Sequence, residues 1–222
     1  MAQFKIVTDS SAHLSDPSLI AELGIEVIPL TVHIGQQAYP ERINQPDEAF
    51  LRKQVQNSKG AWVESPSLAQ AQALFKRLSQ VTDSIVCIHA SSALHDTAEV
   101  MQQATRSFMG RQRIVVLDTL TTSAGLGLIV EAAARAAKDG ASQSEVVKIV
   151  RGMIPHIYAL FLSDSLEYLE AWGRLGPAQT LLGAMLNLKP LATMEDGDLA
   201  PHARRLARRA GCCSTLHRAI GP

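Results

Sequence analysis

Residues 84–117 read SIVCIHASSALHDTAEVMQQATRSFMGRQRIVVL, and this stretch decides the fold. Two short runs rich in Val and Ile, residues 84–89 and 113–117, have the composition of buried strands. The segment between them carries apolar residues at helical spacing and predicts a helix over residues 94–108. A strand, a helix and a second strand in this order are typical of a mostly parallel sheet with crossover helices, so the stretch predicts an α/β fold.

The same alternation continues on both sides of this unit. On the N-terminal side the predicted elements are strands over residues 4–8 and 25–32 and helices over 17–23, 46–58 and 68–79. Pro29 lies inside the second strand and indicates an edge or an irregular stretch. On the C-terminal side the predicted elements are a helix over 122–139 that ends at Gly140 and a helix that begins with the capping box Ser142 and Glu145. Gly125 and Gly127 inside the first of these indicate close packing on a neighbour rather than a dinucleotide loop.

The regular alternation of long helices and short strands changes near residue 156, and the sequence predicts that a second domain begins there. The expected elements are a strand over 156–162, helices over 165–171 and 177–186, and a strand over 188–193. No flexible linker separates the parts. We therefore expect an α/β domain over residues 1–155 and a partial second α/β domain over residues 156–222.

Composition excludes several classes of protein. The 222 residues are 46% hydrophobic and 19% charged, which is the range of a globular protein and not that of a disordered, collagen-like or coiled-coil chain. The three cysteines form no disulfide or metal pattern, and no stretch has the apolar length of a signal peptide or membrane span. We expect a cytoplasmic protein. Residues 201–222 hold five Arg and no acid, but without interleaved aromatics they predict no nucleic-acid partner.

Small hydroxyl residues follow the predicted strands. In open α/β sheets ligands bind beyond the carboxyl ends of the strands, so these residues are the candidates for a site. They are Thr8, Ser10, Ser65, Ser91, Ser92 and Ser123. Such residues cap the helices that follow, and together with helix N–H groups they also bind a carboxylate or a phosphate. Both interpretations stay open at this point.

No strong catalytic motif is present. The chain has no G-x-S-x-G elbow, no P-loop, no HExxH sequence and no metal-ligand spacing, so we predict no catalytic residue and no metal. His89 and His95 are interpreted as core or capping residues and Asp118 as a turn or cap residue. An alternative function is a small-molecule hydrolase or phosphatase that uses Asp9 and the Ser clusters.

Several motifs occur in a familiar order. They are VTDSS at 7–11, ESPS at 64–67, LDT at 117–119, SAGLGLIVEAA at 123–133, SLEYLEAWGRLG at 165–176 and LNLKPLATMEDG at 186–197. Over residues 4–209 the chain resembles the DegV family of bacterial fatty-acid-binding proteins. The last two motifs are the most specific, because composition does not explain them.

The resemblance implies a two-domain DegV-like fold that holds a long-chain fatty acid in an apolar tunnel, with the carboxylate at hydroxyl-bearing loops. It implies a carrier rather than an enzyme, with no cofactor besides the bound fatty acid. Similar proteins present the carboxylate to a separate fatty acid kinase for phospholipid synthesis. The family's Ser pair falls on Ser91 and Ser92, with Ser92 as the expected carboxylate donor, and its arginine turn falls on Arg174.

The chain also departs from the family pattern. Val63 stands where the family has a hydroxyl-bearing Thr, so Ser65 or a water is expected to replace that donor. His95-Asp96-Thr97 replaces Ser-Gly-Thr, and Asp96 is expected to weaken an anion site by its like charge. After Arg209 the resemblance ends. We therefore expect a C-terminally truncated product with an incomplete second domain, exposed apolar surface over 156–193 and marginal stability.

Overall fold

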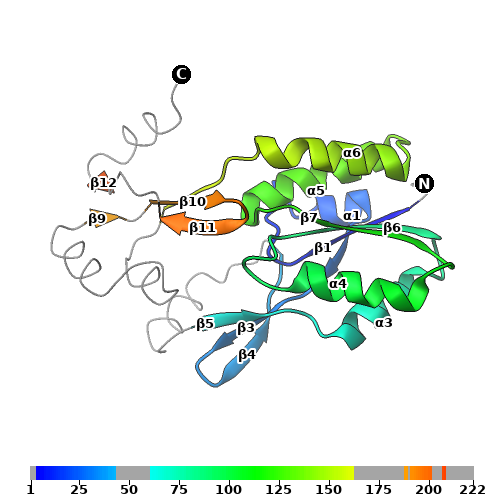
Figure 1. Cartoon of the computed structure of the whole chain (residues 1–222), viewed down its shortest axis with the longest axis horizontal. Helices are drawn as coiled ribbons and strands as arrows, with labels where there is room; N and C mark the ends of the chain where they lie inside the picture. Colours follow the sequence, from blue (N-terminus) through cyan, green and yellow to red (C-terminus); the bar gives the residue numbers. More distant parts are fainter. Residues whose placement is uncertain (1–3, 44–60, 163–187, 190, 202–206, 209–222) are drawn as a thin grey trace. The chain divides into compact units, whose positions relative to one another are not determined.

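The structure, a computed structural model, describes residues 4–43, 61–162, 188–189, 191–201 and 207–208 (Figure 1). The chain divides into two compact units, Met1–Ile157 and Tyr158–Pro222. The division into one complete and one incomplete domain stays a prediction. The predicted helices over 46–58, 165–171 and 177–186, and Arg174, lie outside the described residues.

A four-stranded parallel sheet forms the centre of the first unit and confirms the predicted α/β fold. Its strands, in spatial order, are β2 (Glu26–Ile28), β1 (Lys5–Asp9), β6 (Ser84–His89) and β7 (Arg113–Asp118). Val7 lies opposite Cys87, and His89 lies opposite Asp118. Because β1, β6 and β7 end in register, their last residues meet at one edge of the sheet.

Helices cover both faces of this sheet, as Figure 1 shows. One layer consists of α1 (Leu19–Leu23), α5 (Ser123–Lys138) and α6 (Gln143–Met153), and the other of α3 (Leu68–Leu78) and α4 (Thr97–Thr105). Along β6, Val86 and Ile88 join the first core, whereas Ile85 and Cys87 join the second. A strand buried on both faces is mostly apolar, which explains the unbroken apolar run at 85–88.

The strand predicted over 25–32 is divided in two. β2 ends at Ile28, and after Pro29 the chain enters β3 (Thr31–Ile34), which belongs to a separate antiparallel sheet with β4 (Gln37–Pro40) and β5 (Ala61–Glu64). Proline has no N–H to continue a ladder, so the break falls there. The β4 strand was not predicted.

Helix ends follow the capping chemistry of the sequence. Ser142 and Glu145 form the predicted capping box of α6, and Ser67 forms another with Gln70 at α3. The helix predicted from residue 94 begins instead at Thr97, because the preceding segment is a turn in which the Leu94 N–H donates to the Ser91 carbonyl (3.0 Å). A 3-10 turn, η1 (Arg106–Phe108), follows α4.

The described part of the second unit is antiparallel. β10 (Leu191–Glu195) pairs with β11 (Asp198–Pro201) and with β8 (Leu160–Leu162), and β9 (Leu188–Lys189) pairs with β12 (Ala207–Arg208). The strand predicted from residue 156 is shorter than expected. Its first residue belongs instead to a second 3-10 turn, η2 (Ile154–His156).

Helix α5 lies close to the loop after β1, as the two glycines in its first turns predict. A Cβ at Gly127 would lie 1.9 Å from the carbonyl oxygen of His13 and 2.6 Å from its carbonyl carbon. A Cβ at Gly125 would lie 2.5 Å from Thr121 Oγ1. The first contact is with backbone, so a side-chain rotation cannot relieve it.

We expect Gly127→Ala to lower the free energy of unfolding by roughly 1–3 kcal/mol, because the new methyl group forces α5 away from the loop. The matched control is Gly152→Ala near the end of α6, where an added Cβ meets nothing within 4 Å. Alanine there should raise the free energy of unfolding by about 0.5–1 kcal/mol. Urea unfolding of both variants measures the difference, and equal midpoints would contradict the close packing.

Candidate functional site

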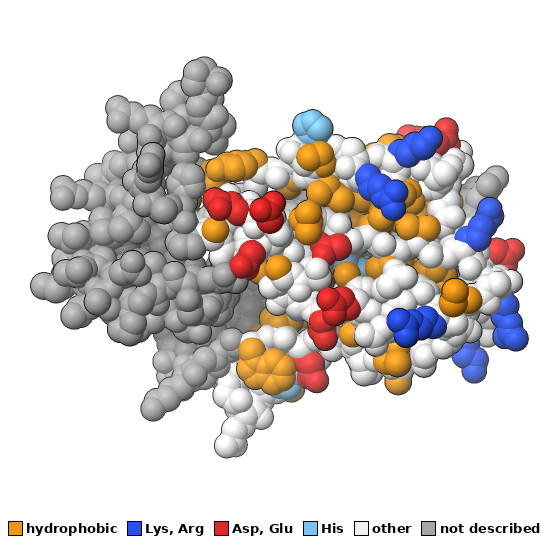
Figure 2. Space-filling view, in the orientation of Figure 1, with side chains coloured by type: hydrophobic (Ala, Val, Ile, Leu, Met, Phe, Trp, Pro, Cys, Tyr) orange, Lys and Arg blue, Asp and Glu red, His pale blue; other side chains and the backbone are white. Residues whose placement is uncertain are grey.

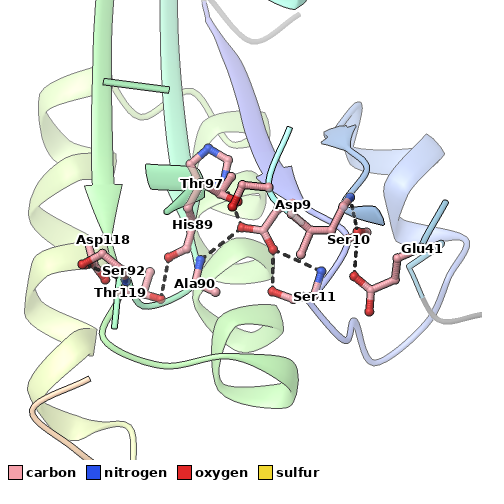
Figure 3. A network of polar contacts seen from close by, with 12 residues as sticks. Asp9, Ser10, Ser11, Glu41, His89, Ala90, Ser92, Thr97, Asp118 and Thr119 are labelled. Carbon is pink, nitrogen blue, oxygen red and sulfur yellow. Dashed lines mark hydrogen bonds and ion pairs between the residues drawn. The ribbon is translucent and has the colours of Figure 1, made fainter. Parts of the chain in front are cut away.

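Asp9 is the centre of a polar network at the carboxyl edge of the parallel sheet (Figure 3). The side chain is fully buried. Its Oδ1 accepts hydrogen bonds from the Ser11 N–H (3.1 Å) and the Ser11 hydroxyl (2.5 Å). Its Oδ2 accepts from the Ala90 N–H (3.1 Å) and lies 2.9 Å from His89 Nδ1. One carboxylate therefore ties the ends of β1 and β6 to the loop after β1.

These contacts keep Asp9 ionised and determine which ring nitrogen of His89 carries a proton towards it. Burial alone raises the pKa of Asp9, but the hydrogen bond and charge of His89, with the Ser11 hydroxyl, outweigh it and lower the pKa to about 2. An ionised carboxylate only accepts hydrogen bonds, so His89 carries a proton on Nδ1. His89 Nε2 is buried and has no hydrogen-bond partner among the described residues.

Ser10 and Glu41 form a second contact beside Asp9. The Ser10 hydroxyl donates to Glu41 Oε2 (2.8 Å) and accepts from the Leu30 N–H (2.9 Å). Burial raises the pKa of Glu41, the hydrogen bond from Ser10 opposes this, and the like charge of Asp9 adds to it. The orientation of the Ser10 hydroxyl is therefore fixed by two hydrogen bonds, one to Glu41 and one from the backbone after β2.

The Ser pair lies at the end of β6. Ser91 is buried and Ser92 is exposed. The Ser92 N–H (3.1 Å) and hydroxyl (2.5 Å) donate to Asp118 Oδ2, and the Leu120 N–H donates to Asp118 Oδ1 (2.8 Å). Asp118 is thus a turn residue, as predicted. Both donors of Ser92 are therefore taken by the Asp118 carboxylate.

The other predicted site residues lie on neighbouring segments. Thr8 is buried in β1 and its hydroxyl has no partner among the described residues. Ser123 joins the loop after β1 by backbone, since its N–H donates to the Ser11 carbonyl (3.1 Å) and its carbonyl accepts from His13 (3.0 Å). Ser65 accepts a hydrogen bond from Thr97 at the start of α4 (3.1 Å).

Val63 differs from the other predicted site residues, because it is apolar and belongs to the antiparallel sheet. It is exposed on β5, opposite Val32 in the antiparallel sheet. Ser65, two residues later, is the hydroxyl that touches α4. Val63 therefore supplies an apolar surface rather than a donor.

Sequence reasoning missed the role of the two histidines at this edge. Both ring nitrogens of His95 are shielded from solvent and have no hydrogen-bond partner among the described residues. Burial lowers the pKa of His95, with opposing contributions from the charges of Asp9, Asp96 and Asp118. One sequence signal could have identified His89. It is a polar residue at the end of a buried strand, and the adjacent strand ends in Asp9.

The chemistry of this edge is that of binding rather than of nucleophilic attack. Both Asp9 oxygens are occupied by donors, and a carboxylate with a pKa of about 2 is a poor base, which disfavours Asp9 as a nucleophile. Within the described ranges no group of three His, Cys, Asp or Glu side chains is placed to hold a metal ion.

Charged side chains are unevenly distributed on the face that Figure 2 shows. The Lys and Arg side chains lie toward the right of the view, whereas most Asp and Glu side chains lie nearer its middle and left. Among the helices the structure describes, none has the length and apolar character needed to cross a membrane. Cys87 is buried, and burial raises the pKa of its thiol, so it stays protonated and inert.

Known sequences resemble this chain over most of its length. The family model for uncharacterised proteins of the DegV family matches residues 3–212. A DegV domain-containing protein of Caldanaerobacter subterraneus is 34% identical over 199 residues, which cover 90% of this chain and 70% of that relative. One of Deinococcus radiodurans is 30% identical over 222 residues, covering 93% and 78%.

Solved structures share the fold. A fatty-acid-binding DegV family protein of Thermus thermophilus superposes with a TM-score of 0.79 at 28% identity, over 98% of this chain and 77% of that one. The fatty acid kinase B3 protein of Streptococcus pneumoniae, loaded with linoleic acid, superposes with a TM-score of 0.75 at 20% identity, over 98% and 79%.

The Asp9 network makes a prediction about stability. Asp9→Asn should lower the free energy of unfolding by roughly 3 kcal/mol near neutral pH, because the amide NH₂ would face a donor and leave it unpaired. The folded-state pKa of Asp9 is about 2, below the unfolded value of 3.8, so its contribution is complete above the unfolded value and is lost as the pH falls.

Urea unfolding at several pH values tests this. Between about pH 5 and pH 2 the wild type should lose about 2 kcal/mol more than Asp9→Asn does. The control is Asp83→Asn, an exposed residue at the opposite edge of the sheet, which should follow the wild-type curve. Parallel curves for the wild type and Asp9→Asn would show that the Asp9 carboxylate is not held as described.

Proposed function

We propose, from the premise that the chain belongs to the DegV family, that it binds a long-chain fatty acid with the carboxylate at the carboxyl edge of the parallel sheet. The head group is held by Ser92, with Ser91, Ser10, Thr8, Ser123 and Ser65 around it. The acyl chain occupies an apolar tunnel. The protein is a carrier and not an enzyme.

The observation that carries this proposal is the set of hydrogen-bond donors at one edge of the sheet. The N–H and hydroxyl of Ser92 converge on one carboxylate oxygen of Asp118, and a ligand carboxylate that takes the place of Asp118 would accept both of these hydrogen bonds. The Thr8 and Thr121 hydroxyls are buried there without a partner in the described part of the chain. Buried polar groups are normally hydrogen-bonded, so unpaired hydroxyls favour an absent polar ligand.

The comparisons support the same ligand class. The Thermus thermophilus relative binds fatty acid. A DegV family structure of Ruminococcus gnavus is described with vaccenic acid, and a protein of Eubacterium ventriosum with the same fold is described as stearic-acid-binding. Each buried CH₂ of an acyl chain contributes about 0.8 kcal/mol, so a long chain offsets the cost of ordering the ligand. The head group then fixes orientation more than affinity.

We further propose a fatty acid kinase as the protein partner. The support is the likeness in fold to the fatty acid kinase B3 protein of Streptococcus pneumoniae. Arg174, which belongs to the SLEYLEAWGRLG motif, would neutralise the head group or meet phosphate on the kinase. The Asp9 contacts described above weigh against the alternative of a hydrolase or phosphatase.

Native mass spectrometry of the gently purified protein tests the ligand class. We expect a co-purifying species whose mass matches a long-chain fatty acid and which is lost after delipidation. A ligand-free protein that takes up no added palmitate and hydrolyses model esters or phosphates would contradict the carrier.

A substitution tests the head-group site. Ser92→Ala should weaken palmitate binding by roughly tenfold, because it removes one hydrogen bond to a charged group. The control is Ser107→Ala, which replaces an exposed serine of η1, before β7 and so at the opposite edge of the sheet. Titration calorimetry measures both. Equal affinities for Ser92→Ala and the wild type would show that the Ser pair serves only the turn after β6.

A further inference from the structure

Two histidines at the carboxyl edge leave ring nitrogens without a partner. His89 is fully buried, and its Nε2 has no hydrogen-bond partner among the described residues. Both ring nitrogens of His95 are in the same situation. Buried polar atoms are normally hydrogen-bonded, so three unpaired ring nitrogens beside the proposed head-group site indicate that a ligand group completes them.

Carboxylates surround these imidazoles. Three carboxylates raise the pKa of His95 by their charge, namely Asp9 on β1, Asp96 before α4 and Asp118 on β7. The charge of His89 on β6 lowers it. Glu41 is a further carboxylate next to Asp9. A ligand carboxylate that enters these surroundings meets several like charges, so an additional positive charge close to it would favour its binding.

We propose that binding of a fatty-acid carboxylate is coupled to uptake of one proton by His95, whose imidazolium then becomes the charged partner of the ligand. This inference rests on the proposed function and specifies how the same site is regulated. The proton comes from solvent and adds to a ring nitrogen of His95, and no covalent bond is broken. His89 is already paired with Asp9 at 2.9 Å, so the role of the new charged partner falls to His95.

The direction of the pH dependence follows from the surroundings of His95. Burial lowers its pKa before the ligand arrives, the charge of Asp9 opposes this, and the charge of His89 adds to it. The free protein thus holds His95 neutral at physiological pH. The negative charge of the bound carboxylate raises the pKa, so affinity increases as the pH falls through the bound-state pKa and levels off below the free-state pKa.

Titration calorimetry with palmitate tests the coupling. The wild-type protein is titrated near pH 7 in phosphate and in Tris, whose ionisation enthalpies differ, and the difference in observed heat gives the number of protons taken up. We expect about half to one proton in the wild type and close to none for His95→Asn. His156→Asn is the matched control, since His156 is exposed and its ring contacts only the Gly152 carbonyl among the described partners (2.8 Å), and it should behave as the wild type.

The outcomes separate this inference from the proposed function. Palmitate binding to the wild type without proton uptake, or uptake that persists in His95→Asn, would overturn the inference and leave the carrier function standing. Absence of palmitate binding to the wild type would overturn both. If His95→Asn does not fold, the ring signal of His95 is titrated by NMR in the wild type with and without palmitate. An upward pKa shift of about one unit or more supports the proposal, and an unchanged pKa refutes it.

Discussion

The buried contact between Asp9 and His89 is the constraint on which the carboxyl edge of the sheet depends. It joins the last residues of two adjacent parallel strands at 2.9 Å, and both side chains are fully buried. The same carboxylate orders the loop after β1 through Ser11. A buried carboxylate is tolerated only when donors satisfy it, so every segment that supplies a donor is fixed in place by Asp9.

This constraint explains why the hydroxyl residues gather. Ser11 is held by Asp9 and in turn accepts the Ser123 N–H, which positions the start of α5. Gly127 lets the same helix approach the carbonyl of His13. The Ala90 N–H also donates to Asp9, which fixes the backbone directly before Ser91 and Ser92. The candidate site at this edge is therefore assembled by backbone contacts around the Asp9–His89 contact rather than by a catalytic motif.

Much of the first unit was predictable from the sequence, because its signals are local. The apolar run at 85–88 and the capping box at Ser142 act over a few residues, and the strand and the helix start that they predict are both confirmed. The strand over 25–32 was predicted as one element, because apolarity does not show where a chain leaves one sheet for another. The separate antiparallel sheet depends on pairings between β3 and β5, which are distant in sequence.

The position of the candidate site was predictable from the sequence, but the contacts between its residues were not. The rule that ligands bind beyond strand ends identified the serines and threonines, whereas His89 and His95 were interpreted as core or capping residues. Their roles depend on pairing across strands, and the contact of His89 joins residues 80 apart in the sequence. Glu41 was missed for the same reason, since its contact with Ser10 spans 31 residues.

NMR of palmitate labelled with ¹³C at the carboxyl carbon tests the central claim most directly, because it observes the head group itself. The account predicts a distinct bound carboxyl signal that is perturbed in Ser92→Ala and unaffected in Ser107→Ala. A bound signal that is identical in the wild type and in Ser92→Ala would place the carboxylate elsewhere and contradict the account.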